Sequence, residues 1–596
     1  MSHTIHYRRP FEPRPRLRKV VVTLALLAAL ASVSRSFALD GLDDKKEQLK
    51  DNGEEREKNK REDREKDRSK PRPKWRMIGN DPANTRNQPF EHRIKPANVS
   101  RLALKWAATT TGDVSATPAI AKGAVYFGDF GGTVWKLNAE TGAVIWSHKV
   151  PDYTGNAGDY ARTSPSLAGD TLVVGVIKGS TVVPGPNMLG IDATTGTLRW
   201  KTQIHPDFHA AMTGSPVLVG NTVITGISAN GAGGTGATFR GAIVALNAQT
   251  GVILWRTYSL PDNGGLPTGY AGATMFSPPA VDVANGLVFG TFGQTYRKPA
   301  SVDACNAAVP GGFDESCEQP GAYWKSIVAF DLKTGESRWS YRVQGHKPWM
   351  RACGSQPPTV TWCPAESDGE KWDMGGSGAN VMRLKIHGRW RDVVGVGEKS
   401  GVYLLLDAKT GKFIWNTLIG PGGDQGGMEW GTAFDGHRIY ASITNHHHIP
   451  YELTQNGVIS NTTATGGSWA ALDPETGKIL WQTADPGLIT LTGPTPPGAG
   501  IFGSWALAPV TSANGIVYAA SMAHQSPTAD QMFALDGKTG EILWRYSTGD
   551  PVSPTGHSVN AGPAVVDGTV YWGSGYARSA EGNGNNKFYA FSIDGQ

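Results

Sequence analysis

Seven near-identical decapeptides constrain the fold of this 596-residue chain more than any other feature. Each has an apolar residue, Asp or Asn, a Thr-Gly step and a final tryptophan, as in "LNAETGAVIW" and "LDAKTGKFIW". The seven copies end at Trp146, Trp200, Trp255, Trp339, Trp415, Trp481 and Trp544. Glycine suits a turn position with positive φ, and the Asp or Asn side chain can bond to the backbone of that turn. The decapeptide therefore predicts a strand, a tight turn and a second strand that carries tryptophan.

The sequence between these copies also reads as short strands. Runs such as "TLVVGVI" and "GTVYWGSGY" are rich in Val, Ile and Tyr and are bounded by turn residues, whereas long amphipathic helical patterns are absent after residue 75. Successive final tryptophans are 54, 55, 84, 76, 66 and 63 residues apart. Because a four-stranded propeller blade needs about 40–50 residues, each repeat accommodates one blade and its loops. The chain is predicted to be an all-β propeller in which stacked blades bury each other's faces.

The ends of the chain favour eight blades. Leu102–Trp106, "LALKW", is a tryptophan strand that lacks its turn, and the C-terminal "KFYAFSIDGQ" is the first half of the motif without its tryptophan strand. Together they complete one more repeat, so N- and C-terminal strands would close the ring within one blade. The alternative is seven blades with irregular ends.

The N-terminal region is predicted to be an export signal and a linker. Residues 1–39 contain a basic segment, the apolar run "VVVTLALLAALASVS" and Ala38 as a plausible cleavage point, which is typical of a secretory signal peptide. An uncleaved anchor is the alternative, although the run is shorter than the roughly 20 apolar residues of a spanning helix. Residues 40–74 are almost all charged and predict a disordered linker. We therefore expect a periplasmic or secreted propeller over residues 75–596, with no membrane span after signal removal.

The charge distribution and the cysteine positions limit which partners, disulfides and metal sites this chain can have. Residues 1–74 carry a net charge of +7 and residues 75–596 carry −2, which together give +5. The propeller region thus gives no electrostatic case for a nucleic-acid partner. Cys305 and Cys317 are 12 residues apart, and Cys353 and Cys363 are 10 apart. In an oxidising compartment each near pair would form a disulfide. A metal site is the other interpretation, but the sequence has no CxxC and no CxxCH haem motif.

The repeat, its tryptophan and the eightfold count resemble the PQQ-dependent quinoprotein alcohol dehydrogenase family. The segments "GNDPANTRNQPFEHRIKPANVSRLALKW", "GEKSGVYLLLDAKTG", "GGDQGGMEWGTAFDGHRIY" and "AGPAVVDGTVYWGSGYAR" are similar to polyvinyl-alcohol dehydrogenase-like members, and the likeness runs from about Trp75 to the C-terminus. The resemblance implies an oxidoreductase that transfers hydride from a primary or secondary alcohol, including polymeric ones, to pyrroloquinoline quinone (PQQ). It also implies a bound Ca²⁺ and an external electron acceptor such as a separate cytochrome c.

The resemblance assigns roles to individual residues. Asp373 in "GEKWDMGG" would be the general base and a metal ligand, and Lys399 would face the quinone oxygens. The other cofactor-binding candidates are Arg162, Arg240, Phe276, Gln294, Trp430 and Trp505. Five of these residues also have a structural interpretation: Asp373 as a turn residue, Lys399 as a solvated lysine, Trp430 and Trp505 as plugs between blades, and Arg240 as the partner of a carboxylate.

The sequence departs from the family at the cation site. The blade that supplies a family Glu ligand has no acidic residue from Phe208 to Pro261, so only Asn230 or main-chain carbonyls could replace it. Gln294 stands for the Asn ligand and Phe276 for the ring-stacking Trp, and the adjacent cysteine pair that caps the quinone is missing. Because Ca²⁺ prefers several oxygen ligands with carboxylates among them, we expect a weakened cation site at Asn230, Gln294 and Asp373.

Two rival functions remain open. A propeller with this repeat can be a non-catalytic binding or assembly scaffold, which the eroded cation site favours. A carbohydrate-active propeller would need paired carboxylates near the axis, and none is evident. The consecutive histidines His446–His448 point to alternate faces if they lie on a strand, so we expect an exposed loop there and no metal site.

Overall fold

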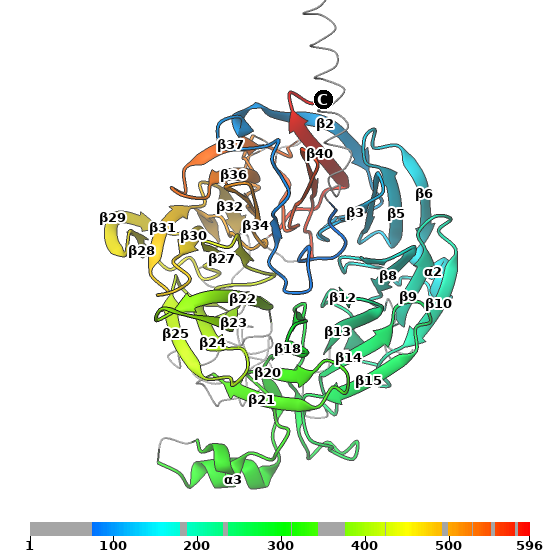
Figure 1. Ribbon diagram of the computed structural model, residues 1–596, viewed down its shortest axis with the longest axis vertical. Coiled ribbons are helices and arrows are strands. Elements are labelled where there is room, and N and C mark those ends of the chain that lie inside the picture. The colour runs from blue at the N-terminus through cyan, green and yellow to red at the C-terminus, as the bar shows by residue number, and fades with distance from the viewer. Residues whose placement is uncertain are drawn as a thin grey trace, which may run out of the picture. The chain divides into compact units, whose positions relative to one another are not determined.

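The computed structural model describes residues 74–178, 187–229, 237–310, 313–343, 376–423, 425–491, 499–526, 528–549, 555–578 and 582–596. In these residues the chain forms eight four-stranded antiparallel blades around a central axis (Figure 1). The predicted fold is therefore confirmed. No helix in these ranges is long and apolar enough to cross a membrane.

The first four blades follow one another along the chain. Blade I consists of β3 (Ala119–Ala121), β4 (Ala124–Gly128), β5 (Thr133–Asn138) and β6 (Val144–Lys149), and blade II of β7 (Ser166–Ala168), β8 (Thr171–Gly175), β9 (Asn187–Asp192) and β10 (Leu198–Gln203). Blade III consists of β12 (Val217–Val219), β13 (Thr222–Ala229), β14 (Ala242–Asn247) and β15 (Ile253–Tyr258), and blade IV of β17 (Ala280–Asp282), β18 (Leu287–Phe292), β20 (Ser326–Asp331) and β21 (Ser337–Arg342).

The remaining blades complete the ring. Blade V consists of β22 (Ala379–Ile386), β23 (Arg389–Gly397), β24 (Val402–Asp407) and β25 (Phe413–Leu418), and blade VI of β26 (Ala433–Phe434), β27 (Ile439–Ile443), β30 (Ser468–Leu472) and β31 (Ile479–Ala484). Blade VII consists of β34 (Thr511–Ala513), β35 (Ile516–Ala520), β36 (Met532–Asp536) and β37 (Ile542–Tyr546), and blade VIII of β38 (Ala564–Val566), β39 (Thr569–Gly573), β40 (Lys587–Ile593) and β2 (Leu102–Thr109).

Blade VIII closes the ring with both ends of the propeller chain. Strand β2 pairs antiparallel with β40, from Leu102 opposite Ile593 to Thr109 opposite Lys587. Figure 1 shows β2 and β40 side by side next to the C-terminus. The predicted closure by terminal strands is confirmed, and a seven-bladed ring is excluded.

The tryptophan of every blade is a fastener between neighbours. In all eight blades its Nε1 donates to a main-chain carbonyl of the next blade at 2.8–3.3 Å, for example from Trp415 to Pro474 and from Trp544 to Leu102. The ring packs on the Thr-Gly turn of that next blade. A Cβ at Gly477 would lie 2.6 Å from the Trp415 ring, and its φ is +74°. Glycine is therefore required twice over, for the turn and for the close approach of the indole.

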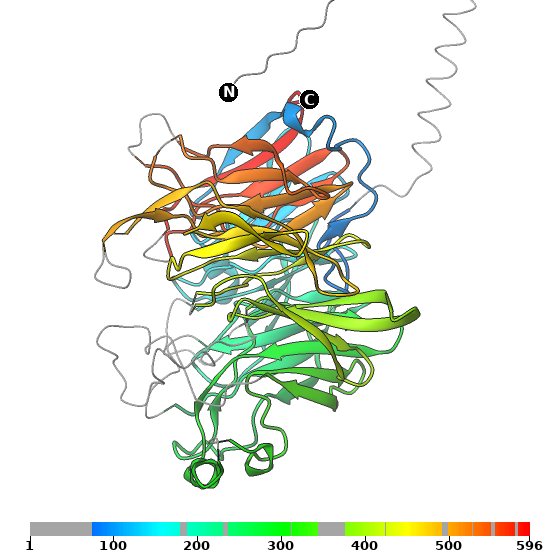
Figure 2. The same ribbon diagram turned by 90° about the vertical axis from the view of Figure 1, so that its left-hand side faces the viewer.

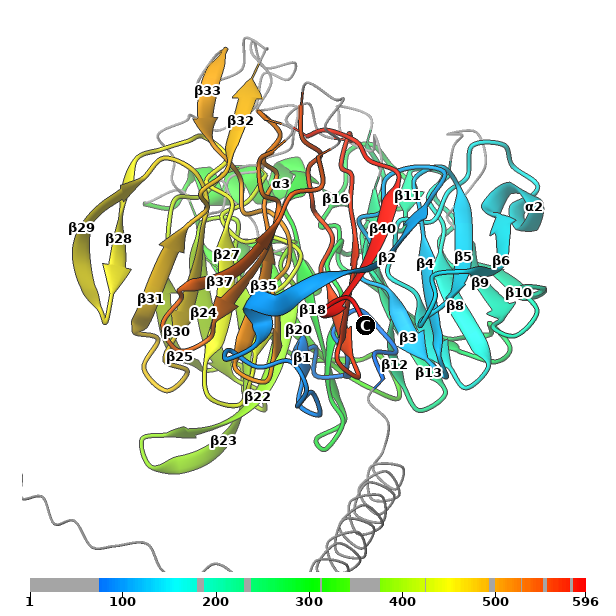
Figure 3. The same ribbon diagram turned by 90° about the horizontal axis from the view of Figure 1, so that it is seen from above.

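Short elements lie outside the four-stranded blades. They are β1 (Asn87–Gln88), β11 (Ala210–Ala211), β16 (Ala271–Gly272), β19 (Thr295–Arg297), β28 (Tyr451–Gln455), β29 (Val458–Ala464), β32 (Leu488–Leu491), β33 (Gly500–Gly503), α2 (Val150–Thr154), α3 (Ala300–Ala307) and the 3₁₀ turns η1 (Val99–Arg101) and η2 (Glu315–Cys317). Some of them, such as α2, α3 and the β28–β29 hairpin, are at the outer edge of the ring (Figure 1). Figure 3 shows β16 and the β32–β33 hairpin at one end of the propeller and β1 at the other.

Arg86 fixes the N-terminal segment to the ring. Its side chain is fully buried and donates to the main-chain oxygens of Val510 at 2.9 Å and Ile78 at 3.1 Å. Its Nη2 also donates to the hydroxyls of Thr117 at 3.3 Å and Thr511 at 3.4 Å. Burial lowers the pKa of this guanidinium to about 9. Arg86 thus joins the segment before blade I to blades I and VII.

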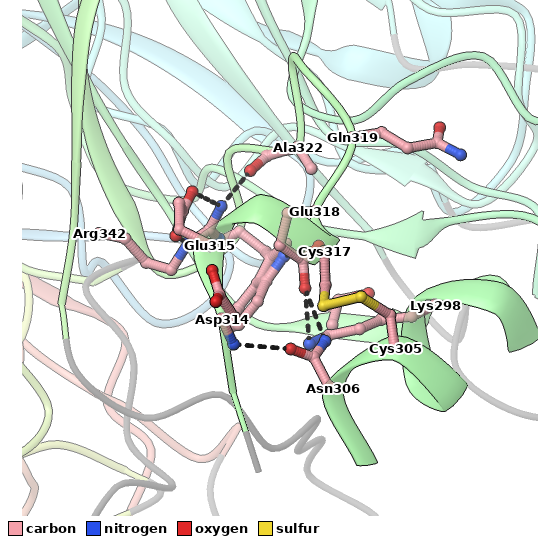
Figure 4. Close-up of polar contacts among 12 residues, drawn as sticks. Lys298, Cys305, Asn306, Asp314, Glu315, Cys317, Glu318, Gln319, Ala322 and Arg342 are labelled. Carbon is pink, nitrogen blue, oxygen red and sulfur yellow. Dashed lines mark hydrogen bonds and ion pairs between the residues drawn. A yellow bond between two sulfur atoms is a disulfide. The ribbon is translucent and has the colours of Figure 1, made fainter. Parts of the chain in front are cut away.

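An insertion between β18 and β20 projects from blade IV (Figures 1 and 2). Cys305 and Cys317 form a disulfide with 5.7 Å between their Cα atoms, which confirms the predicted pair (Figure 4). Beside it, Lys298 Nζ lies 3.0 Å from Glu318 Oε1, and both side chains are almost fully buried. The insertion is therefore cross-linked by a disulfide and has a buried ion pair of its own. The second predicted pair, Cys353 and Cys363, lies outside the described residues.

Candidate functional site

The candidate site lies on the axis, where the segments before the innermost strands of the blades converge. A pocket there is lined by Ile78, Ser115, Thr117, Arg162, Ser164, Thr213, Ser215, Phe276, Pro278, Trp430, Pro509 and Asn560. Hydroxyls connect neighbouring blades around it: the Thr117 amide donates to Ser164 Oγ at 2.9 Å, and the Ser164 amide to Ser215 Oγ at 3.0 Å. Blades I to IV and VI to VIII thus contribute lining residues through the segment that precedes their innermost strand.

Arg162 supplies a cation held by aromatic rings. Its guanidinium carbon lies 4.9 Å from the ring centre of Trp430, 5.6 Å from Phe130 and 5.9 Å from Tyr576. Its Nη2 also donates to the Tyr576 hydroxyl at 3.3 Å. Cation–π contacts of this kind are worth about 0.5–2 kcal/mol each, depending on how far they are desolvated. Arg162 is therefore oriented without being neutralised by these contacts.

Lys399 supplies a second cation, which lies over Phe276. Its Nζ lies 3.1 Å from Glu429 Oε1 and 5.1 Å from the ring centre of Phe276, and the Lys399 and Glu429 side chains are 10% and 6% exposed. Phe276 meets Trp430 edge to face with 6.3 Å between ring centres. Arg162, Phe276, Lys399, Glu429 and Trp430 therefore form one continuous group, which we call the axial cluster.

Trp430 occupies a strained backbone conformation at the centre of this cluster. Its φ is +65°, and the amide of Gly431 donates to the Glu429 carbonyl at 2.9 Å across it. A bulky residue at positive φ within such a three-residue turn is rare, and strain of about 1–3 kcal/mol is typical of functional sites. The strained turn places Glu429 and Trp430 side by side, so that one faces Lys399 and the other Arg162.

Two buried polar atoms of the pocket have no hydrogen-bond partner within the described ranges. They are Nε1 of Trp430, a donor, and Oδ1 of Asn560, an acceptor. Buried polar groups without a protein partner are uncommon, and they normally form a hydrogen bond to a ligand or to an ordered water molecule. The pocket thus offers the cation of Arg162, flat apolar rings and unsatisfied polar atoms, and Lys399 adds a second cation against the lining residue Phe276. This set suits a planar anionic ligand.

Trp505 belongs to an aromatic layer beside the cluster. It is 1% exposed and packs with Ile489, Leu507, Met522 and Tyr576, with Trp430 and Phe130 at the edge. Its Nε1 donates to Nε2 of His448 at 3.3 Å. The two sequence-predicted tryptophans are therefore brought together.

The histidine run differs from its expectation. His448 is 6% exposed rather than part of an exposed loop, because its ring packs on Phe502 and Trp505. Burial, followed by electrostatic interaction with His446, lowers the pKa of His448 to about 4. His446 also packs edge to face against Trp505, with 4.8 Å between ring centres. The run thus supports the aromatic layer.

Arg240 and Gln294 make contacts outside the pocket lining. Arg240 Nη2 lies 3.2 Å from Asp262 Oδ1, and its guanidinium lies 4.2 Å from the Tyr258 ring centre, so the structure gives it the structural partner that the sequence left open. Gln294 is buried between β18 and β19, and its main-chain oxygen accepts from the Ala273 amide at 2.7 Å. Neither residue lines the pocket.

The cation site is not assembled by the described residues. Within them, no three His, Cys, Asp or Glu side chains cluster in a way that could hold a metal ion. The carboxylate of the axial cluster, Glu429, is paired with Lys399. The two other predicted ligands, Asp373 and Asn230, lie outside the described part of the chain.

Sequence reasoning missed Glu429, Phe130 and Tyr576. A usable signal was present, because the tetrapeptides "SATP", "RTSP", "TGSP" and "FSPP" precede innermost strands at the same step of their blades. Aligning those steps places Ser115, Arg162, Thr213 and Phe276 at one position, four residues before the innermost strand, and all four line the pocket. The residue at that position of blade VI, four before β26, is Glu429.

Comparison with known proteins agrees with this architecture. Residues 75–374 match the family described as glucose/ethanol/alcohol dehydrogenase, beta-propeller domain, whose name is PQQ. This chain belongs to that family. Residues 399–595 of this PQQ-family propeller also match the family of the outer membrane protein assembly factor BamB. The chain is an oxidoreductase of the PQQ-dependent family.

Individual relatives cover most of this PQQ-family chain. A polyvinylalcohol dehydrogenase of a Pseudomonas species is 28% identical over 557 residues, covering 88% of this chain and 77% of its own. A quinohemoprotein alcohol dehydrogenase of Comamonas testosteroni is 24% identical, with the same coverage. Its crystal structure superimposes with a TM-score of 0.61 at 21% identity, covering 88% of this chain and 81% of that one, which supports the fold.

Proposed function

We propose that this protein oxidises primary or secondary alcohols, polymeric ones included, by hydride transfer to PQQ bound in the axial pocket. The observation that carries the proposal is the placement of two cations on an aromatic pair: Arg162 lies over Trp430, Lys399 lies over Phe276, and the two rings meet edge to face. PQQ is a planar tricarboxylate with an ortho-quinone, so it needs flat surfaces and cationic partners.

The residues of the axial cluster fit this group. Arg162 and Lys399 would meet its oxygens, Phe276 and Trp430 would hold its ring, and Trp430 Nε1 and Asn560 Oδ1 would find partners. When bound, PQQ supplies a two-electron acceptor for hydride. The second electron-transfer step would pass electrons to a separate carrier such as a cytochrome c.

The chain's own residues would orient and shield the reaction. Glu429 holds the Lys399 ammonium group in place, and three aromatic rings hold the Arg162 guanidinium. Trp505 and Tyr576 form a buried apolar layer that keeps water from the pocket. Excluding water strengthens electrostatic interactions inside the site. Asp373 would take the alcohol proton as general base, and this assignment stays with the family resemblance.

The cation is the part of the proposal with the weakest set of ligands. Ca²⁺ would rely on Asp373, Gln294 and Asn230, and the described residues add no further free carboxylate cluster. Because the loss of a ligand or its support typically costs 10–100-fold in metal affinity, we expect Ca²⁺ to bind more weakly than at a site with two carboxylates.

The setting of the reaction follows from the N-terminal sequence and from the relatives. We propose that residues 1–39 direct export and that residues 40–74 are a linker to the propeller, so that the enzyme works in the periplasm or outside the cell. The polyvinylalcohol dehydrogenases among the relatives support a hydroxylated substrate, polymeric or small.

Titration calorimetry of the purified protein with PQQ and Ca²⁺ tests the proposal. We expect saturable 1:1 binding by the wild type, binding at least tenfold weaker in Arg162→Met, and unchanged binding in Arg338→Met, whose exposed side chain pairs with Asp331. Absence of PQQ binding by the wild type would refute the enzyme proposal. It would favour the scaffold alternative, which the match of residues 399–595 to the assembly-factor family supports.

A further inference from the structure

Asp485 stands out when the eight repeats of this chain are compared with one another. It lies four residues after the fastening tryptophan Trp481. The equivalent residues in the other blades are Val150, Ile204, Ser259, Val343, Ile419, Thr548 and Thr110. All of them are buried, and none is ionisable. Blade VI therefore carries a carboxylate at a step where every other blade has an apolar or hydroxyl side chain.

The surroundings of Asp485 do not compensate a negative charge. Its side chain is buried, and its Oδ1 accepts from the Gly487 amide at 2.8 Å, while Oδ2 is buried without a hydrogen-bond partner among the described residues. The hydroxyls of Ser521 and Ser504 face it from the side of blade VII, and Tyr451 faces it from β28. No charged side chain of the described ranges acts on it. Burial therefore dominates and raises the pKa of Asp485 to about 7.

Three more buried hydroxyls lie at the same end of blade VI. They are Thr444 Oγ1, Ser468 Oγ and Tyr451 Oη, each buried and without a hydrogen bond of good geometry within the described residues, although the Ser468 and Tyr451 hydroxyls face each other. Ser468 starts β30 and pairs with Ile443 on one side and Ala484 on the other. Thr444 and Asp485 directly follow those two partners. Buried polar groups gathered in this way are normally satisfied by internal water, which makes about three hydrogen bonds per molecule.

Thr444 connects this polar group to the axial cluster. A Cβ at Gly426 would lie 2.7 Å from Glu429 Cγ and 3.3 Å from Thr444 Oγ1, so these two side chains flank the same glycine. The Thr444 amide donates to the Gly427 carbonyl at 2.8 Å in the same loop. The group of hydroxyls therefore extends from the side chain next to Lys399 to the buried carboxylate of Asp485.

We propose that Asp485 receives the proton released by alcohol oxidation, through internal water molecules hydrogen-bonded to Thr444, Ser468 and Tyr451. This inference rests on the proposed function. Oxidation of an alcohol to a carbonyl breaks a C–H and an O–H bond: the carbon-bound hydrogen leaves with both electrons as hydride to PQQ, and the hydroxyl hydrogen leaves as a proton. The general base takes that proton, and the hydroxyl and water chain passes one proton on to the Asp485 carboxylate.

Two substitutions at Asp485 and a matched control test the proposal. Asp485→Asn removes the acid with little change of shape, and Asp485→Thr introduces the residue that blade VII has at the same step. Thr548→Val alters that step in blade VII without touching an ionisable group. With PQQ-loaded enzyme, we expect kcat at pH 7 to be at least fivefold lower in both Asp485 variants than in the wild type, with KM unchanged. The inflection near pH 7 in the plot of kcat against pH should be absent from both variants. Thr548→Val should keep the wild-type pH profile. Asp485 variants with the wild-type kcat and profile would overturn the proton path.

Diffraction and unfolding experiments test the proposed proton path to Asp485 without requiring catalytic activity. A crystal structure of the protein at high resolution should show ordered waters bridging Thr444, Ser468 and Asp485, and a dry contact there would overturn the proposal. The melting temperature of the cofactor-free wild type should fall relative to Asp485→Thr as the pH rises from 4 to 7, because the folded state holds a proton that the unfolded state has released. An inactive wild type with ordered waters and this titration would refute the proposed function and keep the proton-binding site.

Discussion

The Nζ atom of Lys399 lies 3.1 Å from Oε1 of Glu429, and both side chains are almost entirely buried. The ion pair joins blade V, which carries Lys399 beside β24, to the strained turn before β26 of blade VI. Lys399 also lies over Phe276 from blade IV. One lysine thus connects three blades at the axis, and its partner was not evident from the sequence.

Glu429→Gln is expected to destabilise the protein. Removing one partner of a buried ion pair typically costs about 3–5 kcal/mol, because it leaves the other charge buried and uncompensated. Lys399→Met should cost a similar amount, whereas the double variant should recover part of the loss. Denaturant unfolding of the four proteins measures the coupling. Strictly additive effects of the two substitutions would contradict a direct pairing.

Arg86→Lys is expected to loosen the N-terminal segment. A lysine cannot reproduce the fork of hydrogen bonds that the guanidinium makes to Val510, Ile78, Thr117 and Thr511. Since hydrogen bonds from charged groups contribute about 1.5–3 kcal/mol each, we expect the free energy of unfolding to fall by about 2–4 kcal/mol. Arg93→Lys, at the exposed ion pair with Asp567, is the control and should change it by less than about 1 kcal/mol.

His448 is expected to make the protein acid-sensitive. Because its folded-state pKa of about 4 is below the ordinary 6.5, its stabilising contribution is complete above pH 6.5 and is lost as the pH falls through 4. The loss would reach about 3 kcal/mol. The melting temperature should therefore decrease more between pH 7 and pH 4 for the wild type than for His448→Asn. The exposed His437→Asn should follow the wild type, and identical curves for wild type and His448→Asn would disprove this role.

The disulfide is expected to stabilise the insertion of blade IV. Closing a loop of this length contributes about 3 kcal/mol at most in the chain-entropy account. The double variant Cys305→Ser/Cys317→Ser should lower the free energy of unfolding by up to that amount and expose residues 298–324 to proteolysis. Serine substitution is preferred to a reductant, since the chain has two further cysteines. Unchanged proteolysis would mean that the buried Lys298–Glu318 pair alone holds the insertion.

Features that repeat in the chain could be predicted, and features that occur once could not. The tryptophan fasteners and the closure by β2 and β40 follow from a local pattern written many times. The contacts of Phe276 with Trp430, and of Lys399 with Glu429, depend on how different blades meet at the axis, which no local pattern encodes. Asp485 is likewise visible only once the blades are aligned with each other. The contacts of Arg240 with Asp262 and Tyr258 likewise depend on how loops of blade III fold, and its role at the cofactor stays a prediction.

The most direct test of the proposed function is a single-turnover absorbance measurement on protein loaded with PQQ and Ca²⁺. The account predicts that excess primary or secondary alcohol reduces the bound quinone in one exponential phase, and that Lys399→Met slows this phase at least tenfold while still binding PQQ. Asp373→Asn should bind PQQ and leave the quinone oxidised. Bound PQQ whose spectrum stays unchanged with every alcohol tested would contradict the assignment of this propeller as an alcohol dehydrogenase.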